Sequence, residues 1–216
     1  MARMSSVSSS GVPETASSRA RASSSQSPVT GVLLLGGASS RFGSPKALAS
    51  LGGVSLAERG WAALAWCDER VAFGKASDNL ELSFPIQDDR NPLRAPIAGL
   101  VAGLRAARHD LVVFLPVDCP FIGEPELRAL AGACRDAAVP PSGPLPGAYR
   151  RSALPILKQR LERGELALHA ALAELDMTVV PLGADRLLNI NTPDDLEEAS
   201  SSPSAGLRAV APDPAE

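Results

Sequence analysis

Short apolar runs are spaced along the middle of the chain and are separated by longer stretches of mixed polarity. Two of these runs, Val32–Leu35 and Leu111–Leu115, are apolar at every position. Such runs are typical of strands that are buried on both faces of a parallel sheet. Shorter runs predict three further strands, at Val71–Phe73, Leu82–Ile86 and Met177–Leu182.

Apolar residues at helical spacing predict helices between these strands. The first helix should begin after Ser55, whose side chain can form a capping box with Glu58, and should end near Trp66. Proline suits the first turn of a helix, so Pro96 and Pro193 indicate the starts of two other helices. The remaining predicted helices are Glu124–Cys134, Ser152–Arg163 and Glu165–Leu175.

Strands and helices therefore alternate, which indicates right-handed crossovers and a mostly parallel sheet. We expect one three-layer α/β/α domain with a Rossmann-like sheet over residues 28–199. The Ser-rich head, residues 1–27, and the tail, residues 200–216, are predicted to be disordered because they lack hydrophobic periodicity. An organelle transit peptide is a competing interpretation of the head, which has Glu14 as its only acid.

Composition narrows the class of protein. The chain has 216 residues, of which 45% are hydrophobic and 21% are charged, and its net charge is −3. These values are typical of a soluble globular protein and favour neither a nucleic-acid partner nor a membrane span. The three cysteines fit neither a disulfide framework nor a zinc site, because they are odd in number and far apart. A reducing cytoplasm is the predicted compartment.

A glycine-rich loop follows the first apolar run. Gly36 and Gly37 end this run, and two cations, Arg41 and Lys46, follow in the loop. Glycine lets the backbone approach a ligand closely, and successive N–H groups in such a turn can bind an anion. Both cations suit phosphate. The loop matches neither the P-loop nor the dinucleotide-binding pattern, so it predicts a triphosphate site of another kind.

A carboxylate follows the second apolar run. Asp118 lies shortly after Leu111–Leu115, between Pro116 and Pro120. Because central parallel strands end at the same edge of a sheet, Asp118 should lie beside the glycine-rich loop. Mg²⁺ prefers oxygen ligands and typically takes one or two carboxylates together with substrate phosphates. The pattern therefore predicts that Asp118 holds Mg²⁺, or Mn²⁺ in its place.

Two further carboxylates and two glycines are expected near this edge. Asp88 and Asp89 follow the predicted strand Leu82–Ile86, at the end where open α/β sheets bind ligands. Gly99 and Gly103 lie on one face of the helix that follows. Glycine inside a helix costs about 1 kcal/mol relative to alanine, so a pair on one face predicts close approach of the sheet or of a ligand.

The last polar motif, Asn-Ile-Asn-Thr-Pro-Asp-Asp-Leu, begins at Asn189. Thr192 and the residues after it suit the N-terminus of a helix and need no functional explanation. Capping does not explain Asn189 and Asn191, whose alternation would direct both to one side of an extended segment.

Four motifs in this order resemble those of the molybdenum cofactor guanylyltransferases, the MobA-like family within the nucleotidyltransferase fold. They are the glycine-rich loop, an Asp followed by Pro-Ile-Ala-Gly, an Asp-x-Pro at Asp118, and the closing Asn-x-Asn-Thr-Pro motif. The resemblance extends over roughly Val29–Ala199. The loop pattern of the family, Leu-x-Gly-Gly-x-Ser-x-Arg-(Met/Phe)-Gly-x-x-Lys, is filled by Leu34, Gly36, Gly37, Ser39, Arg41, Gly43 and Lys46.

The resemblance implies a role for particular residues. Catalysis would fall to Arg41, Lys46 and Asp118, and Asp118 would also bind the metal ion. Asn189 and Asn191 would face the active site on the acceptor side. If the match to the family motif is shifted by one residue, Asp89 would bind the nucleotide in place of Asp88. The nucleotide-binding residues implied by the resemblance are Leu34, Leu35, Gly36, Gly37, Ser39, Lys46, Asp88, Gly99 and Asp118.

The implied reaction is transfer of GMP from GTP to molybdopterin, with release of pyrophosphate. No protein nucleophile is needed, because positioning and charge stabilisation carry this kind of chemistry. Arg41 and Lys46 would neutralise the phosphates. The implied partners are GTP and molybdopterin, with molybdenum enzymes or their chaperones downstream, and the protein is expected to be a monomer or a weak oligomer.

The chain departs from the family pattern at Leu35 and Phe42 and in a short, proline-rich stretch, residues 137–149, where part of the acceptor wall is expected to be missing. Three rival functions remain open. A molybdenum cofactor cytidylyltransferase would usually carry Ala-Ala-Gly where this chain has Leu-Gly-Gly. A sugar-1-phosphate nucleotidyltransferase is generally longer. A silent nucleotide-binding or chaperone-like module would not need Lys46 and Asp118.

Overall fold

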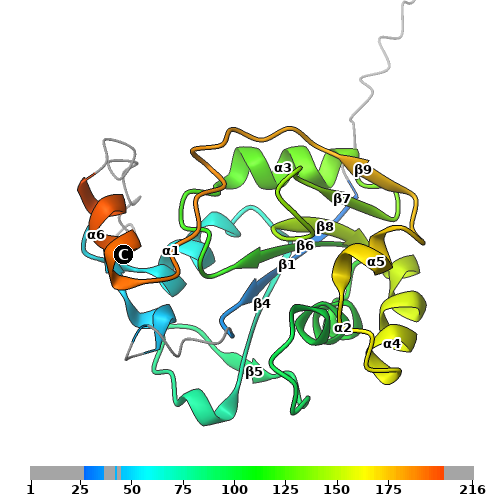
Figure 1. Cartoon of the computed structure of the whole chain (residues 1–216), viewed down its shortest axis with the longest axis horizontal. Helices are drawn as coiled ribbons and strands as arrows, with labels where there is room; N and C mark the ends of the chain where they lie inside the picture. Colours follow the sequence, from blue (N-terminus) through cyan, green and yellow to red (C-terminus); the bar gives the residue numbers. More distant parts are fainter. Residues whose placement is uncertain (1–26, 37–41, 43–44, 202–216) are drawn as a thin grey trace, which may run out of the picture.

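The computed structural model of the protein describes residues 27–36, 42 and 45–201. These residues form a three-layer α/β/α fold around a seven-stranded sheet with the strand order β5-β4-β1-β6-β8-β7-β9 (Figure 1). The predicted fold class is confirmed. The strands of this sheet are β1 (Val29–Leu34), β4 (Glu69–Gly74), β5 (Ile86–Asp88), β6 (Leu111–Pro116), β7 (Ala137–Val139), β8 (Gly147–Arg150) and β9 (Met177–Val179).

The sheet is parallel except for β8, which runs antiparallel to both β6 and β7. β1 lies between β4 and β6 and is parallel to both. The pairing continues just beyond the strands: Leu35 N–H donates to the Phe73 carbonyl at 2.8 Å, and Val117 N–H donates to the Leu34 carbonyl at 2.9 Å. The chain segments that follow β1, β4 and β6 are therefore held side by side at one edge of the sheet.

Helices cover both faces of the sheet (Figure 1). α1 (Leu56–Ala63) and α3 (Glu124–Ala133) pack on one face. α2 (Pro96–Ala106), α4 (Leu154–Glu162) and α5 (Leu168–Leu172) pack on the other. A last helix and a small two-stranded ribbon complete the described fold: α6 (Pro193–Ser201), β2 (Ser50–Leu51) and β3 (Val54–Ser55).

The central strands supply side chains to both apolar layers. In β1, Leu33 packs in the layer with α1 and α3, whereas Val32 and Leu34 pack in the layer with α2. Successive side chains of a strand point to opposite faces, so an uninterrupted apolar run is what a strand buried on both faces requires. The two strands predicted from such runs, β1 and β6, are confirmed.

The start of α1 is as predicted, but its end is not. Ser55 Oγ accepts a hydrogen bond from Glu58 N–H at 3.1 Å, which confirms the N-cap. The helix ends at Ala63 and does not reach Trp66. After Ala63 the chain forms tighter turns, in which Ala65 N–H and Cys67 N–H each donate to the carbonyl three residues earlier.

The strand predicted at Leu82–Ile86 is wrong in its limits, since β5 begins at Ile86. Pro85 has no N–H to donate to a neighbouring strand, which explains why pairing begins after it. The preceding Phe84 is buried and stacks on Trp61, with ring centroids 4.3 Å apart. The apolar residues that we attributed to a strand, Leu82 and Phe84, thus belong to a loop and pack in the hydrophobic core.

The short stretch 137–149 is more complete than its length suggested. It contains β7 and the beginning of β8, which pair with each other in antiparallel orientation. Its prolines lie in the connection between these strands, where no N–H is needed for the sheet. Tyr149 O–H donates to the Pro144 carbonyl at 2.6 Å and closes the connection. This short stretch therefore still contains a strand and the start of its return strand.

Gly99 and Gly103 of α2 face the sheet at close range. A Cβ atom at Gly103 would lie 2.4 Å from Cε1 of Phe114, and one at Gly99 would lie 2.9 Å from Cδ2 of Leu34. Both distances are too short for real atoms, so the glycines allow α2 to approach β1 and β6. Of the two predicted explanations, approach of the sheet is confirmed for both positions.

Gly103→Ala is expected to destabilise the protein by about 1–3 kcal/mol, the usual cost of overpacking a core, because the added methyl group meets the Phe114 ring. Thermal unfolding would measure this as a lower melting temperature. Gly132→Ala is the matched control: in α3 the added methyl group would lie more than 4 Å from every other described residue that could obstruct it. An unchanged melting temperature for Gly103→Ala would contradict the close packing of α2.

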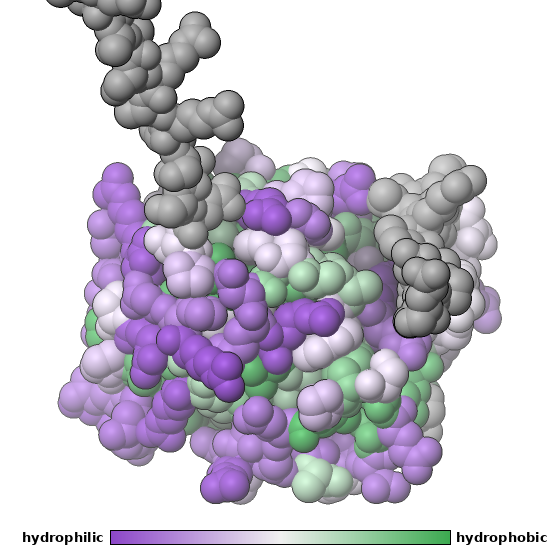
Figure 2. Space-filling model, turned by 180° about the vertical axis from the view of Figure 1, so that it is seen from behind, coloured by the Kyte–Doolittle hydropathy of each residue, from purple (hydrophilic) through white to green (hydrophobic). Residues whose placement is uncertain are grey.

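The surface and the ends of the domain complete the description. On the face turned away from the viewer in Figure 1, hydrophilic residues surround small hydrophobic areas (Figure 2). In the part of the chain that the structure describes, no helix is long and apolar enough to cross a membrane. α6 runs to Ser201, slightly beyond the predicted domain end. Residues 1–26 and 202–216, which comprise most of the predicted head and tail, lie outside the described residues.

Candidate active site

Three predicted residues meet at the edge of the sheet where β1 and β6 end. Gly36 follows β1, Asp118 follows β6, and Lys46 begins a short 3-10 helix after the glycine-rich loop. Lys46 Nζ lies 3.6 Å from Oδ2 of Asp118. The cation and the carboxylate that the sequence predicted beside a triphosphate are therefore next to each other.

Lys46 is held by a second partner that is distant in the sequence. Its Nζ donates to Oδ1 of Asn191 at 3.1 Å. The Lys46 side chain is only 11% exposed, whereas that of Asp118 is 28% exposed. An ammonium group has three donors, so Lys46 retains the capacity to bind a phosphate oxygen while it contacts both partners.

The segment before α6 returns to the end of β6. Ile190 N–H donates to the Asp118 carbonyl at 2.9 Å, and the Ile190 side chain is 1% exposed. On either side of this buried residue, Asn191 accepts from Lys46, and Oδ1 of Asn189 accepts from the Cys119 thiol at 3.2 Å. Alternation around Ile190 thus directs both asparagine amides to the same edge of the sheet.

The turn into α6 keeps this segment in place. Asp195 N–H donates to Thr192 Oγ1 at 3.1 Å, which confirms Thr192 as the N-cap. In return, Oδ2 of Asp195 accepts from the N–H groups of Asn191 and Thr192 at 2.7 and 2.9 Å. These hydrogen bonds hold the pKa of Asp195 below its usual value, and the bond from Asn191 N–H has the largest effect. The capping residues therefore also fix the backbone of Asn191.

Cys119 lies beside the site but does not resemble a nucleophile. Burial raises the pKa of its thiol far above the usual value, and the negative charge of Asp118 raises it further. A thiol of this kind stays protonated, and the thiolate is the nucleophilic form. Its S–H instead donates to Asn189.

A cavity of about 250 Å³ opens above these residues. It extends from Asp118 to the glycine at the end of β1, where a Cβ atom would meet no atom of the described residues within 4 Å. This open space above Gly36 is what close approach of a ligand to the backbone requires. The residues that line the cavity are Leu34, Leu35, Gly36, Lys46, Pro96, Pro116, Val117, Asp118, Cys119, Leu145 and Asn189.

The donor atoms at this cavity are suited to Mg²⁺. Asp118 supplies a partly exposed carboxylate, and Asn189 supplies an amide oxygen beside it. Among the described residues, no three His, Cys, Asp or Glu side chains gather closely enough to hold a metal ion by themselves. Mg²⁺ commonly keeps several waters and binds one or two carboxylates with substrate phosphates, so a single carboxylate fits this mode of binding.

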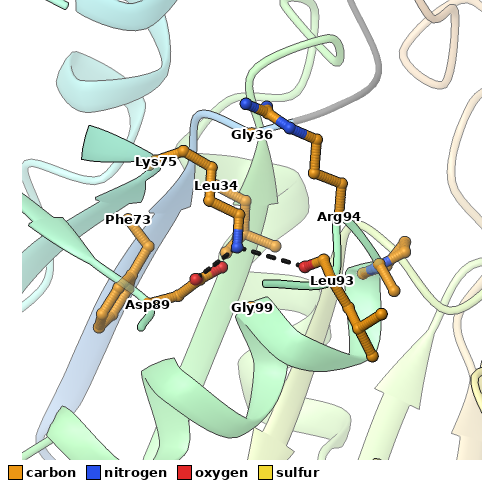
Figure 3. A pocket seen from close by; sticks show the side chains of 11 residues that line it. Leu34, Gly36, Phe73, Lys75, Asp89, Leu93, Arg94 and Gly99 are labelled. Atoms are coloured by element: carbon orange, nitrogen blue, oxygen red, sulfur yellow. Dashed lines mark hydrogen bonds and ion pairs between the residues drawn. The ribbon is translucent and has the colours of Figure 1, made fainter. Parts of the chain in front are cut away.

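A second cavity, of about 180 Å³, lies next to the first and shares Leu34, Gly36 and Pro96 with it. Figure 3 shows the Lys75 side chain reaching across this cavity toward Asp89 and Leu93. Its walls are mostly apolar and its polar groups are few, as is common for small-molecule sites. The residues that line it are Leu34, Gly36, Phe73, Gly74, Lys75, Asp89, Leu93, Arg94, Ala95, Pro96 and Gly99.

The two candidate aspartates after β4 and β5 have different surroundings. Asp88 Oδ2 accepts from Ala76 N–H at 2.8 Å and its Oδ1 accepts from Arg90 N–H at 2.6 Å. These contacts lower the pKa of Asp88 and commit both oxygens to the local backbone. Asp89 lines the second cavity instead. The structure therefore places the alternative residue, and not Asp88, in the wall of a cavity.

Other predicted residues fall into two groups. Leu34, Leu35 and Gly99 line one or both cavities, although Gly99 also has the packing role described above. Gly37, Ser39 and Arg41 lie outside the described residues.

The family was tested by comparison with known proteins. The MobA-like NTP transferase domain matches residues 31–178, which is more than half of the chain. This protein belongs to that family. The matched segment contains all the residues that line the two cavities except Asn189.

Two relatives of this MobA-like protein and one solved structure define the similarity further. It is 37% identical to a probable molybdenum cofactor guanylyltransferase of Deinococcus radiodurans, over 80% of this chain and 94% of the relative. It is 32% identical to one from Bacillus subtilis, over 79% and 96%. The molybdopterin-guanine dinucleotide biosynthesis protein A of Archaeoglobus fulgidus superposes with a TM-score of 0.65 at 26% identity, covering 79% of this chain and 96% of that chain.

Sequence reasoning missed most of the second cavity of this MobA-like domain. Lys75, Leu93 and Arg94 were not predicted as site residues, and Asp89 was only an alternative. A signal was present in Asp-Asp-Arg-Asn-Pro directly after a predicted strand, since Asp and Asn favour turns in which their side chains bind the backbone.

Proposed function

We propose that this MobA-like protein transfers GMP from GTP to molybdopterin, releases pyrophosphate and forms the guanine dinucleotide form of the molybdenum cofactor. The observation that carries this conclusion is that Lys46 contacts both Asp118 and Asn191 at the edge of the sheet. Two adjacent cavities open at this edge, and Gly36 lines both of them. The similarity to molybdenum cofactor guanylyltransferases supports the substrates.

In the proposed reaction an oxygen of the terminal phosphate of molybdopterin attacks the α-phosphorus of GTP. The new P–O bond forms as the bond to the leaving pyrophosphate breaks, and no covalent enzyme intermediate is needed. Lys46 donates to phosphate oxygens and stabilises the charge that develops on them. Asn191 and Asp118 hold the Lys46 ammonium group in position before the substrate binds.

We propose Asp118 as the protein ligand of Mg²⁺, with the Asn189 amide oxygen beside it. When bound, the ion would polarise the phosphate oxygens and offset the repulsion between the triphosphate and the carboxylate. Arg41 is proposed as a second phosphate-binding cation on the basis of its place in the family motif. Mn²⁺ accepts similar oxygen ligands and should replace Mg²⁺ in an assay.

The two cavities suggest how the nucleotide lies. The triphosphate would occupy the cavity at Lys46 and Asp118, and the base would enter the second cavity, whose walls include Phe73, Leu34 and Gly99. Asn189 and Leu145 lie on the other side of the first cavity, toward β8, where we place the molybdopterin phosphate.

Guanine is expected to be the preferred base. We predict that GTP is used at least about tenfold more efficiently than CTP, because one lost hydrogen bond to a buried group costs about that much. The measurement is pyrophosphate release with molybdopterin and Mg²⁺, using GTP, CTP, ATP and UTP in parallel. Preference for CTP would instead indicate the cytidylyltransferase function, and binding of GTP without turnover would indicate the silent module.

The setting of the reaction is also a proposal. The three cysteines are free thiols in the structure, which is consistent with a reducing cytoplasm. We further propose that the product passes to molybdenum enzymes or their chaperones, and that the protein acts as a monomer or a weak oligomer.

A further inference from the structure

Lys46 and Asp118 attract each other but are separated by more than the length of a hydrogen bond. Lys46 Nζ lies 3.6 Å from Oδ2 of Asp118, whereas a charge-assisted N–H···O bond is about 2.7–2.9 Å long. Nζ instead donates to Oδ1 of Asn191 at 3.1 Å. The Lys46 side chain is largely shielded from solvent, which strengthens its attraction to the carboxylate. The contact with Asn191 therefore opposes a closer approach of the two charges.

Asn191 is fixed relative to Asp118 by the backbone on both sides of it. Ile190 N–H, one residue earlier, donates to the Asp118 carbonyl at 2.9 Å, and the Ile190 side chain is buried. Asn191 N–H itself donates to Oδ2 of Asp195 at 2.7 Å. Because one of these anchors is the backbone of Asp118, Asn191 cannot follow Lys46 toward the carboxylate without losing a hydrogen bond.

A direct ion pair between Lys46 and Asp118 would compete with a metal ion for the carboxylate. Lysine has a flexible four-carbon stem, so its ammonium group could close onto Asp118 without any movement of the backbone. A carboxylate that accepts hydrogen bonds from an ammonium group is neutralised and offers less to a hard cation. If both residues are to act on one triphosphate, Lys46 has to be held back from Asp118.

We propose that Asn191 is a positioning residue that keeps Lys46 from closing onto Asp118 and so keeps this carboxylate accessible to Mg²⁺. Asp195 acts one step further away, by fixing the backbone of Asn191. This inference rests on the proposed function, because it takes Asp118 as the metal ligand. It gives Asn191 a role different from the acceptor-side role that the family resemblance implies, since its amide oxygen is committed to Lys46.

Mn²⁺ binding to the full chain without nucleotide tests this inference independently of turnover. Asn191→Ala should weaken Mn²⁺ binding about tenfold, comparable with the loss of one hydrogen bond to a charged group, because Lys46 then closes onto Asp118. Electron paramagnetic resonance of the free ion measures this affinity. The Mg²⁺ concentration for half-maximal pyrophosphate release should rise by a similar factor, and the KM for molybdopterin should stay unchanged.

A double-mutant cycle shows whether Asn191 acts through Lys46. Lys46→Met should bind Mn²⁺ at least as tightly as the wild type, because it removes a cation that lies 3.6 Å from Asp118. In the Lys46→Met background, Asn191→Ala should have no further effect on Mn²⁺ binding. A tenfold loss in both backgrounds would show that Asn191 acts on the metal site without Lys46, which overturns the inference.

Three further variants separate positioning from general structure. Asn191→Asp keeps an oxygen acceptor for Lys46 and should not weaken Mn²⁺ binding. Asp195→Ala releases the backbone of Asn191 and should weaken Mn²⁺ binding, again only when Lys46 is present. Asp194→Ala removes the neighbouring acid from the same first turn of α6 and should leave Mn²⁺ binding unchanged.

The outcomes distinguish this inference from the proposed function. Unchanged Mn²⁺ affinity of Asn191→Ala overturns the inference, and a higher KM for molybdopterin beside it assigns Asn191 to the acceptor. Wild-type Mn²⁺ binding that Asp118→Asn does not reduce overturns both the inference and the proposed metal site. The expected effects of Asn191 on Mn²⁺ binding, in a protein that does not transfer GMP to molybdopterin, leave the inference intact and overturn the proposed function.

Discussion

Asp118→Asn is expected to fold normally and to lose turnover by about 10³-fold, comparable with removal of one preorganised charge-stabilising group. The substitution keeps the size of the side chain but removes the negative charge that a hard cation requires. The backbone of Asp118 should stay in place, because it is held by β6 on one side and by Ile190 N–H on the other. GTP affinity should fall less than kcat.

The measurement for Asp118→Asn is pyrophosphate release as a function of Mg²⁺ concentration, with the melting temperature as a check of folding. Asp110→Asn is the matched control, because Asp110 directly precedes β6 at its other end and pairs there with Arg150 at 2.6 Å. It should retain wild-type turnover. Wild-type kcat of Asp118→Asn at low Mg²⁺ would show that Asp118 is not the metal ligand.

Lys46→Ala is expected to lower turnover by about 10²–10³-fold, because it removes a preorganised donor to the phosphate oxygens. The ammonium group is held before substrate arrives by Asn191 and Asp118, so no reorganisation is needed at the moment of reaction. Removing it also deprives the Asp118 carboxylate of the cation that lies 3.6 Å away. We therefore expect weaker GTP binding together with lower kcat.

Single-turnover kinetics at saturating GTP would separate the loss of chemistry in Lys46→Ala from the loss of binding. Lys158→Ala is a suitable control, since Lys158 is a half-exposed lysine of α4 that pairs with Glu162 one helical turn away. Its effect on turnover should be negligible. If Lys46→Ala folds correctly and turns over at the wild-type rate, Lys46 is a structural residue and the proposed mechanism fails.

Much of the fold follows from local rules that act over a few residues. Uniform apolar runs predicted β1 and β6 because a strand covered on both faces needs no polar positions. Ser55 and Thr192 predicted helix starts because their hydroxyl groups satisfy backbone N–H groups within the same turn. The predicted limits of β5 were wrong for two reasons. Pro85 interrupts strand pairing, and the apolar Phe84 packs on Trp61, which is distant in the sequence.

The sequence also identified two residues of the proposed phosphate site, Lys46 and Asp118. Each of them follows a local signal, the glycine-rich loop for Lys46 and the apolar strand β6 for Asp118. The contact of Lys46 with Asn191 has no such local signal. Lys46 and Asn191 are 145 positions apart, and their hydrogen bond depends on how the segment before α6 returns across the sheet edge. Motif resemblance suggested that they share a site, but only the folded chain shows which atoms meet.

The different surroundings of Asp88 and Asp89 were decided by tertiary structure alone. Each carboxylate accepts a hydrogen bond from the backbone N–H two residues further on, so no local rule says which one lines a cavity. The difference arises because β5 pairs with β4, which places Ala76 N–H beside Asp88 and the Lys75 ammonium group beside Asp89. The sequence specifies the strands and their caps through short-range geometry, whereas side-chain partners across strands depend on the register of the whole sheet.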